Sequence, residues 1–271
     1  MNVQLPARLG RTAVALGAAG LLAVASFGSV DAASPTTVTN SATATASHRF
    51  CIPEWAAVVA HPGNVDRLRA AGDCEINRRF VTLDGLTYLV NHSDVLTAEH
   101  KTDLLDVNSG NPTSFAAERA GLTTLKGSID TDTTAAALRA DIAKIAPDFW
   151  VYLVAVPKTH LVVAADGSAK AAARFGPLGT ELQNLINEAK TDGKDVTAAQ
   201  DALDDMTAKV AQASGLIGPV AGSVLPLSPT DLNNGSAKPV LQAARQTLQQ
   251  ARTLLRDAGR DARKVIAILG S

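Results

Sequence analysis

The C-terminal segment of the chain carries an apolar residue at every third or fourth position. These residues are Leu241, Ala244, Leu248, Ala251, Leu255, Ala258, Ala262, Val265 and Leu269. In an α-helix this spacing brings all of them to one face, where they form a continuous apolar seam. A helix with such a seam is not stable alone in water and must pack on other helices. The small alanines at alternate positions predict that its partners approach closely.

Two earlier segments show the same periodicity in one phase: Leu178, Leu182, Leu185 and Ala189, then Val196, Ala199, Leu203, Met206, Val210, Ala213 and Ile217. Residues 178–217 are therefore either one long helix or two helices that turn at residues 191–195. The turn is favoured, because Asp192 falls on the seam and would be costly to bury. Gly193 would then follow the first helix, and Asp195 would cap the second.

The part of the chain before these segments is also helical in pattern. Apolar residues recur at three- and four-residue steps in two stretches: Ile76, Phe80, Leu83, Leu86 and Val90, then Phe115, Leu122, Leu125 and Ile129. Interruptions rich in Gly, Pro and Asn are predicted at residues 107–114, 215–229 and 233–236. The fold is therefore predicted to be all-α, an antiparallel helical bundle of about five or six helices with coiled-coil-like heptad seams.

Residues 150–166, WVYLVAVPKTHLVVAAD, are very apolar but contain a proline. A strand hairpin that turns at PKTH, a membrane span and a buried helix are the alternatives. Pro157 and the neighbouring polar residues argue against a span, and a lone hairpin among helices is only marginally stable. The helix is favoured, because one seam enters and crosses the segment: Leu138, Ile142, Ile145, Phe149, Tyr152, Val156 and Val163.

This helix is predicted to be the central and most buried one, with a kink at Pro157. Proline has no N–H to donate to the Leu153 carbonyl, which is why a kink is expected there. His160 lies beside the predicted kink, near the seam, and a histidine of the core or its boundary is the simpler interpretation. Tyr152, Pro157 and His160 are the candidate ligand or kink site.

The N-terminus has the pattern of a secretory signal peptide. Arg8 and Arg11 precede the apolar residues 12–27, a stretch too short for a typical membrane span. Small residues favour cleavage after Ala32; cleavage after Ala33 and an uncleaved anchor are the alternatives.

The predicted domain organisation follows from this cleavage site. Residues 1–32 are the signal peptide, residues 33–50 a flexible Ser/Thr/Ala-rich tether, and residues 51–271 the helical bundle domain. The mature chain is expected to be secreted, either extracellular or in the cell envelope, and to contain no membrane span.

Cys51 and Cys74 are the two cysteines of the chain. An even number of cysteines in an exported chain predicts a disulfide, and two unpaired thiols are the alternative. The disulfide would staple an entry segment, residues 51–74, to the rest of the bundle. It would add on the order of 3 kcal/mol to the free energy of unfolding.

No motif for metal, nucleotide or hydrolytic chemistry is found in the sequence. Residues 106–111, DVNSGN, begin like a calcium loop, but Gly110 stands where a ligand is needed and Ala117 where a bidentate Glu belongs. Neither a metal nor a cofactor is expected. The net charge of −1 gives no support for nucleic-acid binding. The basic side chains of the last helix are expected to form a solvated face rather than an anion-binding surface.

Three segments resemble a group of uncharacterised secreted, Ala-rich α-helical proteins of high-GC Gram-positive bacteria. They are TTLKGSIDTDTTAAALRADIAKI, VYLVAVPKTHLVVAADG and DGKDVTAAQDALDDMTAKV. The resemblance implies an exported helical protein and carries no catalytic residues. Pro147 and the NSGNPTS interruption depart from the pattern of the group, which puts helix continuity in question at both places.

We therefore expect a non-enzymatic secreted or cell-envelope protein that acts by interaction or as a scaffold. Its partner, an unknown protein or a cell-wall component, and its oligomeric state are left open by the sequence. A small-ligand carrier with an apolar pocket around Tyr152, Val156 and His160 is the alternative. An enzyme is the third hypothesis, and His160 and Asp166 are the residues that the sequence offers for it.

Overall fold

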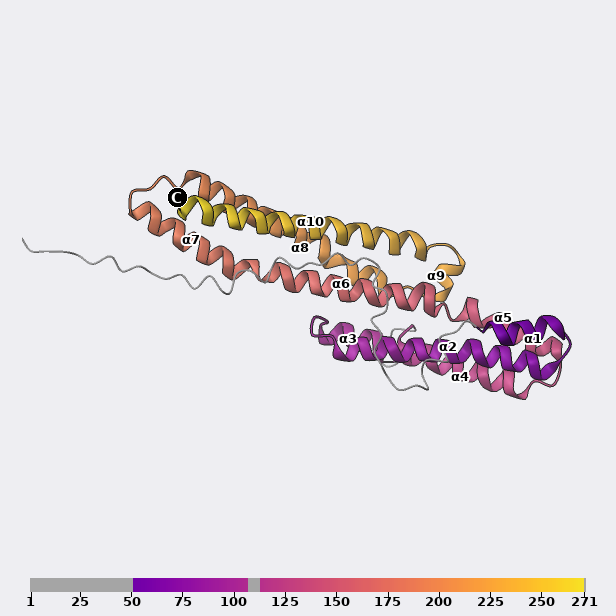
Figure 1. Cartoon of the computed structure of the whole chain (residues 1–271). Helices are drawn as coiled ribbons and strands as arrows, with labels where there is room; N and C mark the ends of the chain where they lie inside the picture. The colour runs from indigo at the N-terminus through magenta and orange to yellow at the C-terminus, as the bar shows by residue number, and fades with distance from the viewer. Residues whose placement is uncertain (1–50, 107–112, 271) are drawn as a thin grey trace, which may run out of the picture. The chain divides into compact units, whose positions relative to one another are not determined.

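The computed structural model describes residues 51–106 and 113–270, and in these residues the fold is all-α, as predicted. They contain ten α-helices and one π-helical segment and no strand, so the helices outnumber the predicted five or six. The difference arises from short helices such as Ile52–Ala60 and Pro229–Asn233, and from a break that divides one predicted helix after Asp148 (Figure 1). The signal peptide, its cleavage after Ala32 and the tether fall outside the described residues.

Five helices precede the π-helical segment: α1 (Ile52–Ala60), α2 (Val65–His92), α3 (Ala98–Leu105), α4 (Phe115–Thr131) and α5 (Ala135–Asp148). Side-chain oxygens cap the N-termini of α2 to α5, where Asn64, Thr97, Ser114 and Thr134 each accept a bond from a backbone N–H of the first turn. The long helix α2 packs on α1, α4 and α5. Its predicted seam is buried at Ile76, Leu83, Leu86 and Val90, whereas Phe80 is half-buried.

Five helices follow: α6 (Val156–Ala173), α7 (Phe175–Thr191), α8 (Thr197–Val224), α9 (Pro229–Asn233) and α10 (Ala237–Gly270). The two longest, α8 and α10, run side by side, and α6 packs on both (Figure 1). The predicted seam of α10 is buried from Leu241 to Val265, whereas Leu269 is half-buried. Arg245, Arg256 and Arg260 lie on the exposed face of α10.

Two helices with a turn, rather than one long helix, form residues 178–217. α7 ends at Thr191 and α8 begins at Thr197. Gly193 has a φ of 80°, the left-handed conformation that favours glycine after a helix end. Asp195 accepts a hydrogen bond from the Thr197 N–H at 3.0 Å, although Val196 occupies the N-cap position itself.

The prediction that residues 215–229 interrupt the second helix is wrong for most of that range. α8 continues to Val224, with Pro219 inside it. The helix breakers Gly215, Gly218 and Pro219 all lie on the exposed side of α8, where water can bond the carbonyl that proline leaves without a donor. The opposite side buries Ile217, Val220 and Val224 in the core, and this packing outweighs the local preferences.

Residues 150–166 are helical, so the hairpin alternative is wrong, but the predicted continuous seam is also wrong. α5 ends at Asp148, and a π-helical segment, η4 (Val151–Ala155), leads into α6. The break is held by Asn233 of α9, whose Nδ2 donates to the Pro147 carbonyl at 2.8 Å. Its Oδ1 accepts from the Trp150 indole at 2.6 Å. The doubt that Pro147 raised about helix continuity is therefore confirmed.

Pro157 lies in the first turn of α6, where the π-helical segment η4 passes into α6 without a break. Residues 151–173 are helical throughout, and the irregularity next to Pro157 takes the form of the π-helical turn that precedes it. One helical stretch of the described residues, Ala135–Thr191, contains a window long and apolar enough to cross a membrane by length and composition alone. Buried core helices of other folds pass the same test, and a single window of this kind is weak evidence for a span.

Candidate functional site

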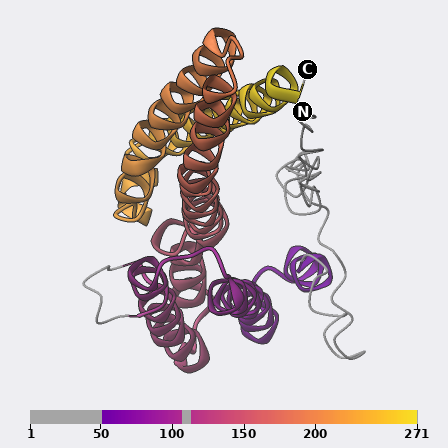
Figure 2. The ribbon, with the colours of Figure 1, turned by 90° about the vertical axis from the view of Figure 1, so that its left-hand side faces the viewer.

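The helix α1 presents an apolar face to solvent. Ile52 is 65% exposed, Trp55 36% and Val59 80%, and their spacing places all three on one side of the helix. Val58 is the buried residue of α1, and the helix packs on α2. Figure 2 shows α1 at the edge of the helices, next to α2. Exposed large apolar side chains grouped on one helical face are typical of an interaction surface.

The disulfide predicted between Cys51 and Cys74 is confirmed, and it fixes this helix in place. Cys51 is the residue before α1, and its carbonyl accepts from the Trp55 N–H at 3.0 Å. Cys74 lies within α2, and the two Cα atoms are 5.9 Å apart. At the other end of α1, the Arg67 guanidinium donates to the Ala57 carbonyl at 3.4 Å. The short helix is therefore held at both ends.

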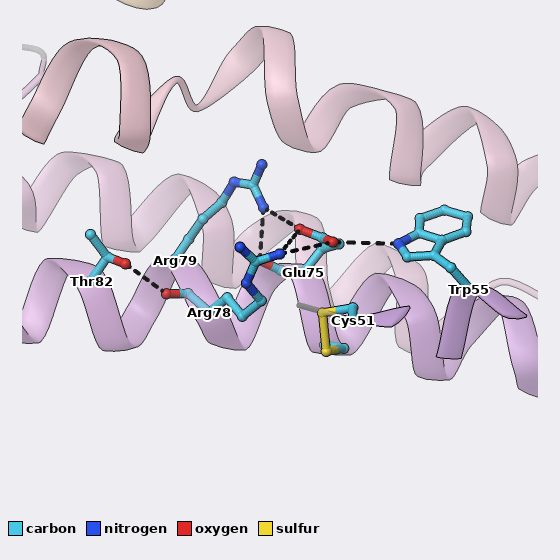
Figure 3. Close-up of polar contacts among 7 residues, drawn as sticks. Cys51, Trp55, Glu75, Arg78, Arg79 and Thr82 are labelled. Carbon is cyan, nitrogen blue, oxygen red and sulfur yellow. Dashed lines mark hydrogen bonds and ion pairs between the residues drawn. A yellow bond between two sulfur atoms is a disulfide. The ribbon is translucent and has the colours of Figure 1, made fainter. Parts of the chain in front are cut away.

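A chain of polar contacts leads from Trp55 along α2 (Figure 3). The Trp55 indole Nε1 donates to Glu75 Oε1 at 3.4 Å. Glu75 also pairs with Arg78 at 3.3 Å and with Arg79 at 3.0 Å, at the spacings that bring side chains together on a helix. These contacts orient the indole, so its exposed edge belongs to an ordered surface.

The same two arginines lie over the ring of Tyr152 in η4. The guanidinium carbon atoms of Arg78 and Arg79 are 5.6 Å and 5.4 Å from the ring centroid, within the range of a cation–π interaction. Tyr152 and its neighbour Leu153 are exposed. The α1 surface, defined as Ile52, Trp55 and Val59, is thereby linked through Glu75 and the arginines to the exposed residues of η4.

Tyr152, Pro157 and His160 do not converge on a common site. Tyr152 faces the arginines of α2, and Pro157 lies in the first turn of α6. His160 is exposed on α6, so the prediction that it lies in or near the core is wrong. Partial desolvation lowers the pKa of its imidazole. The prediction for His160 was wrong because it extended the apolar seam of α5 across the helix break at Phe149.

An open groove of about 560 Å³ lies elsewhere, between α7 and α8. Phe175, Leu203, Met206 and Val210 contribute its apolar lining. Gly179 leaves room for the Met206 side chain, whose Cε would lie 3.4 Å from an added Cβ. None of the three residues predicted as a ligand site lines this groove.

A buried carboxylate that the sequence offered only as a weak catalytic candidate has a structural partner. Asp166 of α6 accepts from the Thr97 N–H at 2.8 Å and contacts His100 Nδ1 at 2.9 Å, which ties the start of α3 to α6. His160 takes no part. No local pattern predicts this pairing, because 66 positions separate Asp166 from His100.

Only one group of potential metal ligands occurs among the described residues, formed by Cys51, Glu54 and Cys74. Both sulfur atoms belong to the disulfide, so the group does not fit a metal. Most of the calcium-loop-like stretch, residues 107–112, lies outside the described residues.

No family model, curated protein or solved structure matches the chain. The suspected resemblance to Ala-rich secreted proteins therefore stays a prediction, and the function has to be argued from the geometry.

Proposed function

We propose that this protein is a secreted, non-enzymatic interaction protein of the cell envelope that docks through the α1 surface into an apolar groove of a partner protein. The observation that carries the proposal is the exposed apolar face of α1, with Ile52 and Val59 more than half exposed. Residues at this spacing are the anchors of helices that bind in grooves.

The way α1 is held supports this role. A free nine-residue helix would be marginal in water and would have to become ordered on binding, at the expense of affinity. The disulfide and the Arg67 contact order α1 beforehand. Trp55 adds a large aromatic side chain of the kind that dominates protein interfaces.

Export is supported by two independent features. The N-terminal sequence has a basic region, an apolar stretch and small residues before Ser34. A disulfide between the two cysteines is the form expected in an oxidising compartment. The cellular location itself is tested by fractionating the producing cells and detecting the chain in each fraction.

A photo-crosslinking amino acid placed at Val59 of the full chain tests the docking proposal in the producing organism. The same group at Ile266, which is 43% exposed on α10, is the matched control. We expect one dominant protein adduct from position 59 that position 266 does not give. Equal adducts at both positions, or none at position 59, would contradict the proposal.

A second candidate function, a carrier of a small amphipathic ligand, is favoured by the groove between α7 and α8. Its volume of about 560 Å³ falls within the size range of small-molecule sites. Native mass spectrometry of the chain purified from its own host tests this. A bound small molecule that Met206→Glu removes would support the carrier, and an unliganded mass would count against it.

A further inference from the structure

Lys158 of α6 has no exposed surface, although lysine is rarely buried. Its Nζ contacts only uncharged oxygens: Thr113 Oγ1 at 2.5 Å, the Thr113 carbonyl at 3.2 Å, and the Leu225 and Leu227 carbonyls at 3.4 Å each. These oxygens come from the residue shortly before α4 and from the end of α8. Lys158 therefore joins three helices at one point.

Two of these contacts lie at the C-terminal end of α8, where Leu225 is the C-cap residue and Leu227 lies just beyond the helix. The last carbonyls of a helix have no donor within the helix and carry its negative partial charge, so an ammonium group satisfies both needs. Thr113 reinforces this arrangement, because its hydroxyl donates to the Leu227 carbonyl at 3.1 Å. The end of α8 therefore depends on Lys158 and on Thr113, which lies two residues before α4.

Glu118 lies near this cluster in the first turn of α4 and is 6% exposed. Its Oε2 atom is buried and has no hydrogen-bond partner. Burial raises the pKa of this carboxyl group to about 7, while the charge of Lys158 acts in the opposite direction. Burial lowers the pKa of Lys158 to about 8, and Glu118 opposes that shift.

Lys158 is the charged group that acts on Glu118, and Glu118 is the one that acts on Lys158. Thr113 and the carbonyls at the end of α8 are neutral. A change in the protonation of Glu118 therefore changes the charge that acts on Lys158.

We propose that Glu118 and Lys158 form a proton-controlled latch on the C-terminal end of α8. With Glu118 protonated, Lys158 stays on the oxygens of Thr113, Leu225 and Leu227. When Glu118 loses its proton to solvent, a buried carboxylate without a partner is costly, and it attracts the Lys158 ammonium away from those oxygens. The carbonyls at the end of α8 then lose their donor, and the last turn of α8 loosens.

Hydrogen exchange of the full chain, corrected for the intrinsic effect of pH, tests the latch. From about pH 5.5 to about pH 7.5, below the pKa of Lys158, we expect protection in residues 220–227 to fall by about tenfold, while the middle of α8 is unchanged. Glu118→Gln, which keeps the shape and cannot ionise, should remove this pH dependence. Glu181→Gln, an exposed change on α7, should keep it.

A wild-type chain with no pH dependence at the end of α8 would overturn the latch, as would an unchanged dependence in Glu118→Gln. If Glu118→Gln fails to fold, the carboxyl ¹³C shift of Glu118 in the wild-type chain decides. Titration near pH 7 together with the loss of protection supports the latch. Titration near the ordinary value for glutamate contradicts it.

Discussion

Cys51 and Cys74 hold the residue before α1 within 5.9 Å, Cα to Cα, of the interior of α2. The helix that follows Cys51 buries little of its own apolar surface, and Ile52 and Val59 stay exposed. Packing on α2 alone therefore does little to hold α1. The covalent link makes a short, outward-facing apolar helix an ordered part of the molecule.

Replacing both cysteines by serine should lower the free energy of unfolding by about 3 kcal/mol, because the cross-link restricts the unfolded chain. Denaturant unfolding of the oxidised wild type and the double variant measures this. Hydrogen exchange should show α1 losing protection while α10 keeps it. A variant in which α1 stays fully protected would show that packing, rather than the disulfide, holds the helix.

Two glycines of α4 should respond to alanine in opposite directions. At Gly121 an added Cβ would overlap the ring of Phe149, so Gly121→Ala should cost about 1–3 kcal/mol of stability. At Gly127 an added Cβ would have no atom within 4 Å apart from the backbone of its own helix. Gly127→Ala should therefore stabilise α4 by about 0.5–1 kcal/mol through helix propensity alone. Thermal unfolding of the two variants tests the contact between α4 and the break at Phe149. Equal effects of the two changes would contradict it.

Stability should fall as pH rises from about 4.5 to about 7, because Glu118 binds its proton more tightly in the folded chain than in the unfolded chain. Its pKa rises from 4.5 to about 7, and at about 1.4 kcal/mol per pKa unit the loss is on the order of 3 kcal/mol. Urea unfolding at both ends of this window measures it. Glu118→Gln should flatten the profile, and a variant as steep as the wild type would exclude Glu118 as the cause.

At higher pH the ionisation of Lys158 changes the stability of the fold in the opposite direction. Its pKa is lowered in the folded chain, so the folded state gives up the proton first and stability rises from about pH 8 to about pH 10.5. The measurement on Glu118 therefore has to stay below pH 8.

Local signals in the sequence were enough to predict several elements. The turn at Gly193 and the long helix α10 follow from backbone chemistry and from a seam that no helix breaker interrupts. The end of α8 was not predictable in this way. Gly215 and Pro219 disfavour a helix locally, and only contacts of Ile217 and Val224 with other helices maintain it.

The candidate sites depended even more on distant parts of the chain. The sequence around Lys158 suggests a solvated residue, and its burial depends on oxygens 45 to 69 positions away. The exposure of α1 was equally hidden, because an apolar stretch beside a cysteine predicts a packed helix. The disulfide could be predicted, since two cysteines in an exported chain have one pairing.

The central claim is that the α1 surface docks into a partner, and the affinity for the protein crosslinked through position 59 tests it most directly. Binding of the purified partner to the full chain is compared for the wild type, Val59→Asp and Ile266→Asp. A charge buried in an apolar interface is costly, so Val59→Asp should raise the Kd at least about tenfold, while Ile266→Asp should leave it within about twofold. Equal affinity of the wild type and Val59→Asp, with both chains folded by circular dichroism, would contradict the claim.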